Sequence, residues 1–443
     1  MKLIKDKKMP KTFVFAAAFL LSASLLSSQG KITLEDKAAG WASYTGQKDL
    51  AGGEITPPDS VRGTTGGYGG TVYRVKTSEE LKKAIHSAGA KIIVVEGMID
   101  MTDTGSGSML PSAVTGSTPA LDKFIETHTQ KSVLPCRTYR EWKEKFTASF
   151  DYNENQNGPA GDLREELNHL WRSQTELIVG DDTTVIGAAV GCGIRGGCWA
   201  VRGVRNVIIR NLEISDCYNP FPAFEAGDGL NASLDGVTVR NSKYVWIDHC
   251  TLKTSFSPEE VAKDKYKTKD GISVKWQVYD GLCDIVQTND FVTVSWCIFK
   301  NHDKTMLIGN GDKVTADINH QTVTLHHNIF DSCVQRLPMV RFATIHIYNN
   351  VYVNQKRYGI DCRKDSRIYS EKNNFEETSK SCTDNKQGSF YDTGSLNLKK
   401  DKLDSSPVWK PSDYYSYTAD SPENAKKEVL SKAGAGKIPV QKF

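Results

Sequence analysis

Three observations predict an all-β fold, a right-handed parallel β-helix. From residue 183 onward, short runs rich in β-branched and aromatic residues recur. An apolar residue near the start of each run returns after 38, 47, 31, 22 and 23 residues, as Val207, Val245, Val292, Val323, Ile345 and Ile368. A further position repeats as Cys250, Cys297, Asn328, Asn350 and Asn373. A quasi-repeat of this length is typical of a solenoid, in which stacked Asn side chains can satisfy one another.

The alternative is an ordinary antiparallel β protein. Antiparallel hairpins join neighbouring strands through turns of roughly two to five residues. Runs such as NVIIRNLEI (206–214) and YVWIDHCTL (244–252) are separated by many more residues than that. We therefore expect one strand per repeat, with extra loops in the longer intervals.

The first 30 residues have the pattern of a secretory signal. Lysines at positions 2, 5, 7, 8 and 11 precede the apolar run FVFAAAFLLSASLL and the small polar stretch SSQG. A transmembrane anchor is the alternative, but a run of about 14 residues is too short to cross a bilayer comfortably. We expect removal of residues 1–30 and a secreted protein, extracellular or, as an alternative, periplasmic in location.

Residues 31–443 are expected to form one domain built on the coils. After an irregular Gly-rich stretch, SEELKKAIHSA predicts an N-terminal helix that caps the coils, itself capped by Thr77 or Ser78. KIIVVEGMID predicts a buried strand. Residues 103–178 are polar, and their last part, LREELNHLWRSQTEL, has helical spacing. We expect a long insertion there, either a flap or a structural cover.

The segment 400–443 is expected to cap the C-terminal end of the domain. It is Lys-rich, and SPENAKKEVLSKAGAGK within it predicts a short helix. Solenoids need caps, so this helix should close the end of the coils or pack along their side. A capped solenoid is expected to be a monomer.

Charge and cysteine content limit the functions that are possible. Residues 1–30 hold five Lys and one Asp, and without them the chain has 51 basic and 52 acidic residues, a net charge of −1. Neither nucleic acid nor a membrane surface is indicated as a partner, so a polyanion would have to bind a local cluster. Ten cysteines in a secreted chain permit disulfides, and no CxxC pairs have the spacing of a zinc site.

Three aspartates form a candidate metal site. Asp235, in ASLDGVTV, precedes a strand, and Asp280 and Asp284 flank GLC in DGLCDI. Residues four apart on a strand lie about 13 Å apart, and a bend would bring them closer. Converging carboxylates repel one another unless a hard cation lies among them, and oxygen-only ligands indicate Ca²⁺ or Mg²⁺. Three solvated surface acids are the alternative.

A basic cluster follows the acids. Lys304 lies in NHDKTMLIG, and Arg336 and Arg341 straddle LPMV in RLPMVR. Arginine binds carboxylates through a planar fork and lysine through a point charge, so the cluster predicts a polyanionic ligand. The alternative is two structural arginines paired with surface acids. Several histidines, including His302, lie on the same strands or at their ends, and no Ser-His-Asp or Cys-His arrangement stands out.

Taken together and in order, these motifs resemble the signature of polysaccharide lyase family 1, the pectate lyases. The matching stretches are VWIDH (245–249), DGLCDI (280–285), DFVTVS (290–295), NHDKTMLIG (301–309) and RLPMVR (336–341), with NVIIRNLEI (206–214) and AGAGK (433–437). The resemblance implies a right-handed parallel β-helix whose loops form a substrate groove. It also implies Ca²⁺-dependent cleavage of polygalacturonate by β-elimination, which yields 4,5-unsaturated oligogalacturonides.

The resemblance assigns roles to the matching residues. Asp235, Asp280 and Asp284 would bind Ca²⁺. Arg336 would take the C5 proton of the sugar, and Lys304, Arg341 and His302 would bind substrate. The chain departs from the family pattern at Ser233 and Val286, where some members have a second Asp and a Lys. Glu225 or Asp228 is therefore a further candidate for the calcium site.

Three other functions compete with this one. A pectin lyase acts on methyl-esterified polymer without calcium, so its site would not need three aspartates. A β-helical polygalacturonase would hydrolyse through a pair of carboxylates, without Arg or Lys at the reacting face. A non-catalytic polysaccharide-binding solenoid would have regular repeats and no acid–base cluster. The aspartates and the basic cluster favour the pectate lyase.

Overall fold

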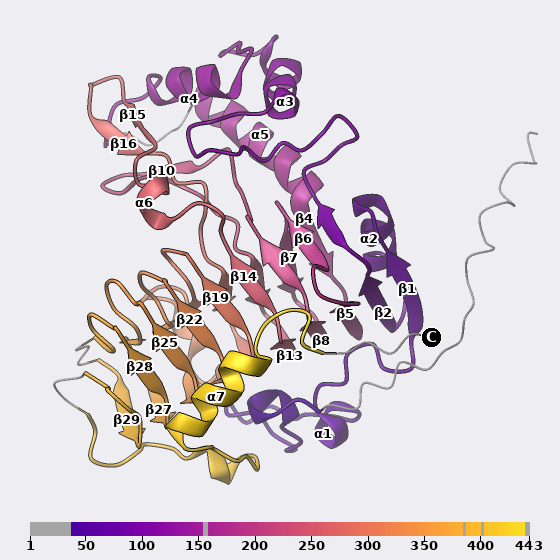
Figure 1. Cartoon of the computed structure of the whole chain (residues 1–443), viewed down its shortest axis with the longest axis vertical. Helices are drawn as coiled ribbons and strands as arrows, with labels where there is room; N and C mark the ends of the chain where they lie inside the picture. The colour runs from indigo at the N-terminus through magenta and orange to yellow at the C-terminus, as the bar shows by residue number, and fades with distance from the viewer. Residues whose placement is uncertain (1–36, 154–157, 384–386, 400–402, 439–443) are drawn as a thin grey trace, which may run out of the picture. The chain divides into compact units, whose positions relative to one another are not determined.

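Three long sheets of parallel strands run through the chain and form a parallel β-helix (Figure 1). The computed structural model describes residues 37–153, 158–383, 387–399 and 403–438, so the predicted signal peptide at 1–30 lies outside the described residues. A complete coil adds one strand to a ten-stranded sheet, one to an eight-stranded sheet and one to a seven-stranded sheet. The predicted parallel β-helix is confirmed.

The strands fall into these three sheets in chain order. The ten-stranded sheet contains β1 (Thr71–Val75), β2 (Lys91–Val95), β5 (Thr183–Gly187), β8 (Arg205–Arg210), β13 (Lys243–Asp248), β18 (Asn289–Ser295), β21 (Gln321–His326), β24 (Thr344–Tyr348), β27 (Arg367–Glu371) and β29 (Ser389–Thr393). The eight-stranded sheet contains β3 (Met98–Asp100), β6 (Gly193–Arg195), β9 (Glu213–Ser215), β14 (Thr251–Lys253), β19 (Ile298–Lys300), β22 (Ile329–Asp331), β25 (Val351–Val353) and β28 (Asn374–Glu376). The seven-stranded sheet contains β4 (Glu176–Val179), β7 (Cys198–Arg202), β12 (Val237–Arg240), β17 (Cys283–Val286), β20 (Leu307–Ile308), β23 (Met339–Val340) and β26 (Asp361–Cys362).

Helices and two antiparallel hairpins lie outside these sheets. The hairpins are β10 (Ala223–Glu225) with β11 (Gly229–Asn231), and β15 (Lys265–Lys267) with β16 (Ser273–Lys275). The α-helices are α1 (Asp59–Arg62), α2 (Ser78–Ile85), α3 (Pro119–Thr129), α4 (Tyr139–Thr147), α5 (Pro159–Thr175), α6 (Pro258–Val261) and α7 (Pro422–Lys432). Within the described residues, none of the helices has the length and apolar character needed to span a bilayer.

Each predicted run contains two strands, so the expectation of one strand per run was wrong. NVIIRNLEI holds most of β8 and of β9, with Asn211 between them at φ 57°. Residues at the same place in five further coils also have positive φ: His249, Trp296, His327, Asn349 and Lys372. A left-handed residue turns the chain sharply. The run thus passes from one sheet to the next while its apolar residues keep pointing inward, which hid the bend in the sequence.

Columns of apolar side chains fill the coils. The six residues that set the sequence intervals are direct neighbours in the ten-stranded sheet, from the pair Val207–Val245 to the pair Ile345–Ile368, and each is at most 1% exposed. In the eight-stranded sheet four rings stack with centroids 4.5–5.0 Å apart: Phe299, Phe330, Tyr352 and Phe375. This burial contributes about 25 cal/mol per Å² of apolar surface and stabilises each coil against the next.

The predicted stack of Asn side chains is confirmed. Asn328 Oδ1 accepts from Cys297 N at 2.9 Å, and Asn350 Oδ1 accepts from Asn328 N at 3.0 Å. Asn373 Oδ1 accepts in turn from Asn350 N at 2.9 Å. The amide groups of the same asparagines donate to backbone carbonyls inside the coils. Each coil therefore satisfies polar groups that the bend of the preceding coil leaves inside the protein.

Helix α2 caps the coils at their N-terminal end, as predicted. The Thr77 side chain accepts a hydrogen bond from Glu80 N, and the Glu80 side chain accepts one from Thr77 N. Together the two bonds form a capping box. Leu81, Ala84 and Ile85 face the main core. The helix thus covers the apolar end of the first coil.

Helix α7 packs along the side of the coils, which settles the choice between an end and a side. Val429 and the following Ala433 contact Ile329 and Val351 on the outside of the eight-stranded sheet. Figure 1 shows α7 lying across several strands.

Residues 433–438, here named the C-terminal strap, continue from α7 across the bend of earlier coils. Gly434 N donates to Trp296 O at 2.8 Å, and Gly436 N donates to Asn211 Oδ1 at 2.8 Å. Asn211 Nδ2 donates back to Ile438 O at 3.1 Å. The AGAGK motif therefore fastens the chain end to a coil more than 200 residues earlier.

The insertion forms a helical cover. The chain leaves the coils after β3 and rejoins them at β4, with α3, α4 and α5 in between (Figure 1). Trp142 and Trp171 are fully buried and both pack edge-on against Phe221, in the loop that follows β9. Lys143 forms a buried ion pair with Asp264 at 2.9 Å. The sequence revealed only the last of the three helices.

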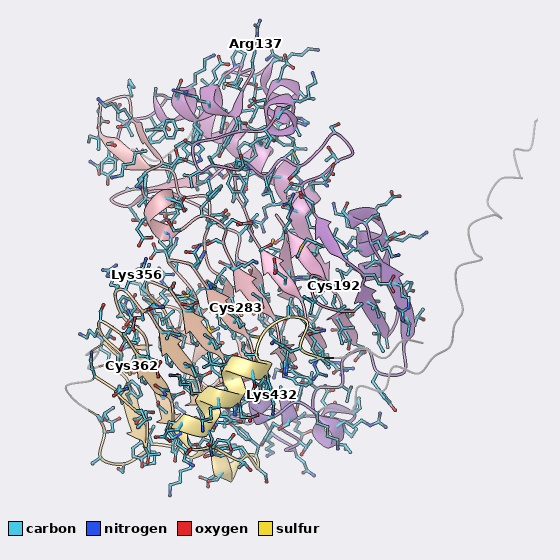
Figure 2. All side chains as sticks on the ribbon, in the orientation of Figure 1. Arg137, Cys192, Cys283, Lys356, Cys362 and Lys432 are labelled. Atoms are coloured by element: carbon cyan, nitrogen blue, oxygen red, sulfur yellow. The ribbon has the colours of Figure 1, made fainter. Side chains whose placement is uncertain are left out.

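The cysteines lie in the interior. All ten are buried, and eight are free thiols: Cys136, Cys192, Cys198, Cys217, Cys250, Cys283, Cys297 and Cys333. The disulfides that the sequence permitted are therefore not formed at these positions. Cys283, labelled in Figure 2, lies in β17 and belongs to the main core. A thiol there acts as a small apolar side chain.

Candidate active site

The outer face of the seven-stranded sheet carries most of the residues that the sequence singled out. In β12, Val237 and Val239 belong to the core, so Thr238 and Arg240 point outward. The same alternation turns Asp284 outward in β17. Four further residues lie on the loops that lead into β12, β17, β20 and β23: Asp235, Asp280, Lys304 and Arg336. Neighbouring strands are about 4.8 Å apart, so side chains from four coils meet on one face.

Asp235 and Asp284 lie against Gly281. Asp235 accepts hydrogen bonds from Gly281 N and from Thr238 Oγ1, both at 2.9 Å. Asp284 Oδ1 accepts from Leu307 N at 2.9 Å. A Cβ atom on Gly281 would lie 2.4 Å from Asp284 Oδ1 and 2.9 Å from Asp235 Oδ1. A larger residue at position 281 would therefore displace one or both carboxylates, a constraint that sequence analysis did not recognise.

The aspartates oppose one another's ionisation. Burial, followed by the charge of Asp280, raises the pKa of Asp235 to about 6. Burial, followed by the charges of Asp235 and Asp280, raises the pKa of Asp284 well above its ordinary value. Carboxylates that repel one another in this way form a donor set that a hard divalent cation stabilises. The three residues fit Ca²⁺ by their chemistry.

Lys304 and His302 both contact Asp280. The Asp280 carboxylate, 28% exposed, forms an ion pair with Lys304 Nζ at 2.8 Å. His302 Nε2 lies 2.5 Å from the backbone oxygen of Asp280. Burial lowers the pKa of His302 to about 4, so the ring is neutral and donates its Nε2–H to that oxygen. His302 was expected among the substrate-binding residues, and the structure places it 3% exposed, where it holds the Asp280 loop.

The two predicted arginines differ in their partners. Arg336 adopts φ 60°, and its buried Nε has no hydrogen-bond partner within the described chain. Its positive charge nevertheless acts on Asp284, where it favours the ionised carboxylate and so opposes the rise in the pKa of that group. Arg341 is bound: its Nε donates to Asp312 Oδ1 at 2.5 Å, and its Nη1 donates to Asn310 O at 2.9 Å. Asp312 was not singled out from the sequence.

A second acidic group lies on the ten-stranded sheet. Asp49, Asp290 and His320 bring ligand atoms within 4.8 Å of one another, the one set of this kind found among the described residues. Lys243 Nζ lies 3.0 Å from Asp49 and 3.4 Å from Asp290, so its ammonium group offsets one of the two negative charges of this set. The three aspartates of the candidate active site are less compact by this measure.

Glu225 and Asp228 are engaged in the β10–β11 hairpin. Asn231 Nδ2 donates to Glu225 Oε2 at 3.0 Å and to Asp228 Oδ2 at 2.8 Å. Asp228 also pairs with Lys275 at 2.9 Å. In the described part of the chain, no hydrogen bond or ion pair links either acid to Asp235, Asp280 or Asp284.

A small cavity of about 80 Å³ opens beside the aspartates. Tyr279, His302 and Asp303 form one side of it, next in sequence to Asp280 and Lys304. Residues of α6 and Lys275 form the other side. The loops that follow β14 and β19 therefore enclose space next to the outer face of the seven-stranded sheet.

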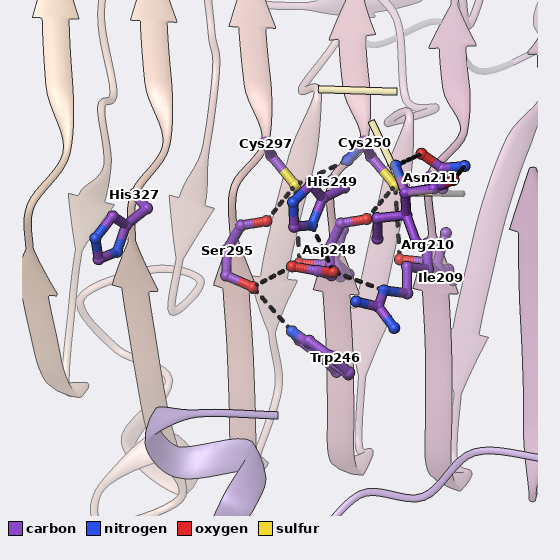
Figure 3. A network of polar contacts seen from close by, with 12 residues as sticks. Ile209, Arg210, Asn211, Trp246, Asp248, His249, Cys250, Ser295, Cys297 and His327 are labelled. Carbon is purple, nitrogen blue, oxygen red and sulfur yellow. Dashed lines mark hydrogen bonds and ion pairs between the residues drawn. The ribbon is translucent and has the colours of Figure 1, made fainter. Parts of the chain in front are cut away.

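The VWIDH motif has a structural position on the ten-stranded sheet. Asp248 is fully buried and accepts hydrogen bonds from Arg210 Nε and Ser295 Oγ at 2.7 Å (Figure 3). His249 Nδ1 lies 2.7 Å from the same carboxylate. Trp246 Nε1 donates to Ser295 Oγ at 2.9 Å, and the Arg210 guanidinium stacks over the Trp246 ring. This network is saturated by the protein's own groups.

Comparisons with known proteins agree with the fold and identify the family. A family model described as pectate lyase matches residues 152–438. Pectate lyase E of Dickeya chrysanthemi is 30% identical over 450 residues, which cover 95% of this chain and 96% of that protein. A solved Bacillus subtilis pectate lyase aligns with a TM-score of 0.70 and 25% identity over 90% of this chain and 100% of that one. A structure titled as pectate lyase bound to hexasaccharide gives 0.69 and 25% over 90% and 99%. This chain belongs to the pectate lyase family.

Proposed function

We propose that the protein is a secreted, Ca²⁺-dependent pectate lyase that cleaves de-esterified polygalacturonate by β-elimination. One observation carries the proposal: three mutually repelling carboxylates share a sheet face with Lys304, Arg336 and Arg341. Such a face suits a polyanion held through a cation and through arginines. Family membership and the hexasaccharide bound to a solved relative support the class of substrate.

β-Elimination needs a base at C5 and stabilisation of charge on the uronate carboxyl. The base takes the C5 proton, the released electron pair forms the C4–C5 double bond, and the C4–O bond breaks. The departing oxygen takes up a proton and becomes a hydroxyl at a new chain end. Ca²⁺ bound by Asp235, Asp280 and Asp284 would neutralise the substrate carboxylate and make the C5 proton more acidic.

We assign proton abstraction to Arg336. Its Nε makes no hydrogen bond to any described residue, so the guanidinium is not committed to a structural partner. Arginine in water keeps its proton up to about pH 12. The assignment therefore depends on a substrate acidified by the cation and on the additional positive charges of Lys304 and Arg341.

Lys304 and Arg341 are proposed to bind substrate carboxylates. Lys304 would exchange Asp280 for the substrate and stabilise the negative charge that develops beside C5. Arg341 is held in place by Asp312 and the carbonyl of Asn310, with its side chain 12% exposed. For His302 we propose positioning of the Asp280 loop, because its ring is buried against that backbone.

Secretion and a monomeric state belong to the same proposal. The basic, apolar and small residues of segment 1–30 support secretion. The α2 cap supports a monomer, because it covers the N-terminal end of the coils. The near-neutral charge of the remaining chain gives no reason to expect nucleic acid or a membrane as a partner.

The test is ultraviolet absorbance during incubation of the purified protein with polygalacturonate. The conjugated C4–C5 double bond absorbs, so absorbance should rise with calcium, stop with a chelator and return when calcium is restored. New reducing ends without absorbance would indicate hydrolysis and contradict the proposal. Activity only on methyl-esterified pectin, insensitive to the chelator, would indicate a pectin lyase. No change with either polymer would leave a binding protein.

A further inference from the structure

A row of arginines crosses the outer face of the seven-stranded sheet. Arg240 is paired in register with Arg202 on one side and with Val286 on the other. Beyond Val286 the strands keep this register, as the pairs Ile285–Ile308 and Ile308–Val340 show. The row that contains Arg240 therefore continues from Val286 through Gly309 to Arg341 and Arg363. Four coils thus present a guanidinium at the same ladder position.

The arginines of this sheet are short of hydrogen-bond partners. Among the described residues, four arginines have a buried Nε without a hydrogen bond: Arg202, Arg240, Arg336 and Arg363. Arg202 and Arg240 lie on strands of the seven-stranded sheet, Arg336 lies on the loop leading into β23, and Arg363 directly follows β26. A buried donor without a partner costs about 1–3 kcal/mol, so a ligand that supplies acceptors is expected there.

Arg240 is the least engaged member of the row. Arg202 is bound to Glu176, Arg341 to Asp312, and Arg363 lies 3.8 Å from Asp361. The Arg240 side chain makes no hydrogen bond and no ion pair with any residue that the structure describes. Its charge still reaches Asp235, where it is one of the influences that favour ionisation.

We propose that Arg240 binds a carboxylate of the substrate at a subsite on the side of Asp284 opposite to Arg336. This inference rests on the proposed function. The sheet order places β17 with Asp284 between β12 and β23, so Arg240 and the Arg336 strand lie on either side of Asp284, while Asp235 shares the coil of Arg240. Three ladder steps separate β12 from β23, roughly 14 Å. A polymer chain of several sugars is needed to reach both.

A counter-ion role for Arg240 is the competing account. An arginine retained to neutralise Asp235 would be expected to hydrogen-bond that carboxylate, since arginine forms directed pairs with carboxylates. The Asp235 oxygens accept from Gly281 and Thr238 instead. The guanidinium therefore remains available on the outer face, next to the carboxylates that would hold the cation.

The experiment compares the wild type with Arg240→Gln on oligogalacturonides from trimers to octamers, at saturating calcium. We expect KM to be unchanged for trimers and to rise about tenfold for the longest oligomers, with kcat unchanged. Arg240→Lys should recover part of the loss, because it retains the charge without the fork. Arg195→Gln, which removes an arginine on the eight-stranded sheet that is paired with Asp100, is the matched control and should change neither constant.

Calorimetric binding of long oligomers, measured alongside, keeps this inference separate from the proposed function. If the wild type yields no unsaturated product, the lyase proposal fails, and a binding difference between wild type and Arg240→Gln still supports the subsite. Equal affinities and equal KM at every length would overturn the subsite. In a repeat at limiting calcium, a change in kcat that is independent of length and is removed by saturating calcium would also overturn it, since Arg240 would then act through Asp235.

Discussion

Two sheets of this protein each bring an aspartate and an arginine together, with opposite results. On the ten-stranded sheet, Asp248 receives hydrogen bonds from Arg210 and Ser295, and His249 contacts the same carboxylate. On the seven-stranded sheet, Asp284 receives one backbone hydrogen bond and faces other acids, while Arg336 leaves its Nε unpaired. Acidic and basic residues alone therefore do not distinguish the two networks; the difference is whether the charged groups already bond one another.

The largest expected effect is the loss of Arg336. Arg336→Lys should reduce kcat about a thousandfold, the range seen when a proton-transfer group is removed, because the ammonium cannot replace the guanidinium at C5. Stability should change little, since the Nε forms no hydrogen bond to described residues that the substitution would break. Steady-state absorbance kinetics and thermal unfolding measure the two quantities. Arg140→Gln on α4 is the control, and a kcat within tenfold of the wild type would remove Arg336 from the role of base.

The opposite pattern is expected for Asp248. Asp248→Asn removes the negative charge that contacts the buried Arg210, 3% exposed, and should lower the free energy of unfolding by about 3 kcal/mol. Denaturant unfolding measures this loss. Activity per folded molecule should remain that of the wild type, because the network lies on another sheet. A loss of kcat without a loss of stability would contradict the division between the two sheets.

Removing a charge from the aspartates should stabilise the calcium-free protein. The pKa of Asp235 is raised from 3.8 to about 6, so the folded protein holds a proton that the unfolded chain has released. Its contribution to stability is therefore fully unfavourable above about pH 6 and disappears below about pH 4. Asp235→Asn should raise the free energy of unfolding by roughly 3 kcal/mol at pH 8 and leave it unchanged at pH 4, measured by unfolding with a chelator present.

Calcium should reverse the order of stability of the wild type and Asp235→Asn. Added calcium should raise the unfolding temperature of the wild type and leave Asp235→Asn nearly unaffected, because the variant has lost one ligand. Equal stabilisation of both proteins by calcium would place the cation elsewhere, for instance at Asp49, Asp290 and His320.

The smallest effect is expected at Asp312, which is 47% exposed and holds Arg341. Asp312→Asn should change the free energy of unfolding by less than about 1 kcal/mol, as exposed ion pairs contribute little. Its loss frees Arg341 from a competing carboxylate, so KM for polygalacturonate should fall by up to about twofold. A rise in KM would show instead that Asp312 positions Arg341.

Features that depend on repetition could be predicted from the sequence. The column from Val207 to Ile368 and the stack of Asn328, Asn350 and Asn373 recur at nearly regular positions, because every coil imposes the same demands. The bends escaped prediction, since a left-handed His249 or Trp296 carries no fixed residue type. Helices α3 and α4 escaped because their apolar faces bury against loops rather than against repeated strands.

The residues of the candidate site also fall into those that the sequence predicted and those that it did not. Asp235, Asp280 and Asp284 were recognised as a set of like charges, and Lys304 and Arg336 as their basic neighbours. Gly281, Thr238 and Arg240 escaped, because their importance depends on strand register across loops of unequal length. The position of His302 under the Asp280 backbone depends likewise on tertiary packing that its residue type does not reveal.

The C-terminal strap has a consequence for the order in which the coils can be completed. In a stack where each coil touches only its neighbours, folding can begin anywhere and spread. The bond from Gly436 to Asn211 spans 225 residues, so it adds contacts of very high sequence separation to an otherwise local array. The corner at β8 cannot acquire these partners until residues 436–438 have been synthesised, after every coil of the β-helix. A fold assembled coil by coil is thus fastened only after its last coil exists.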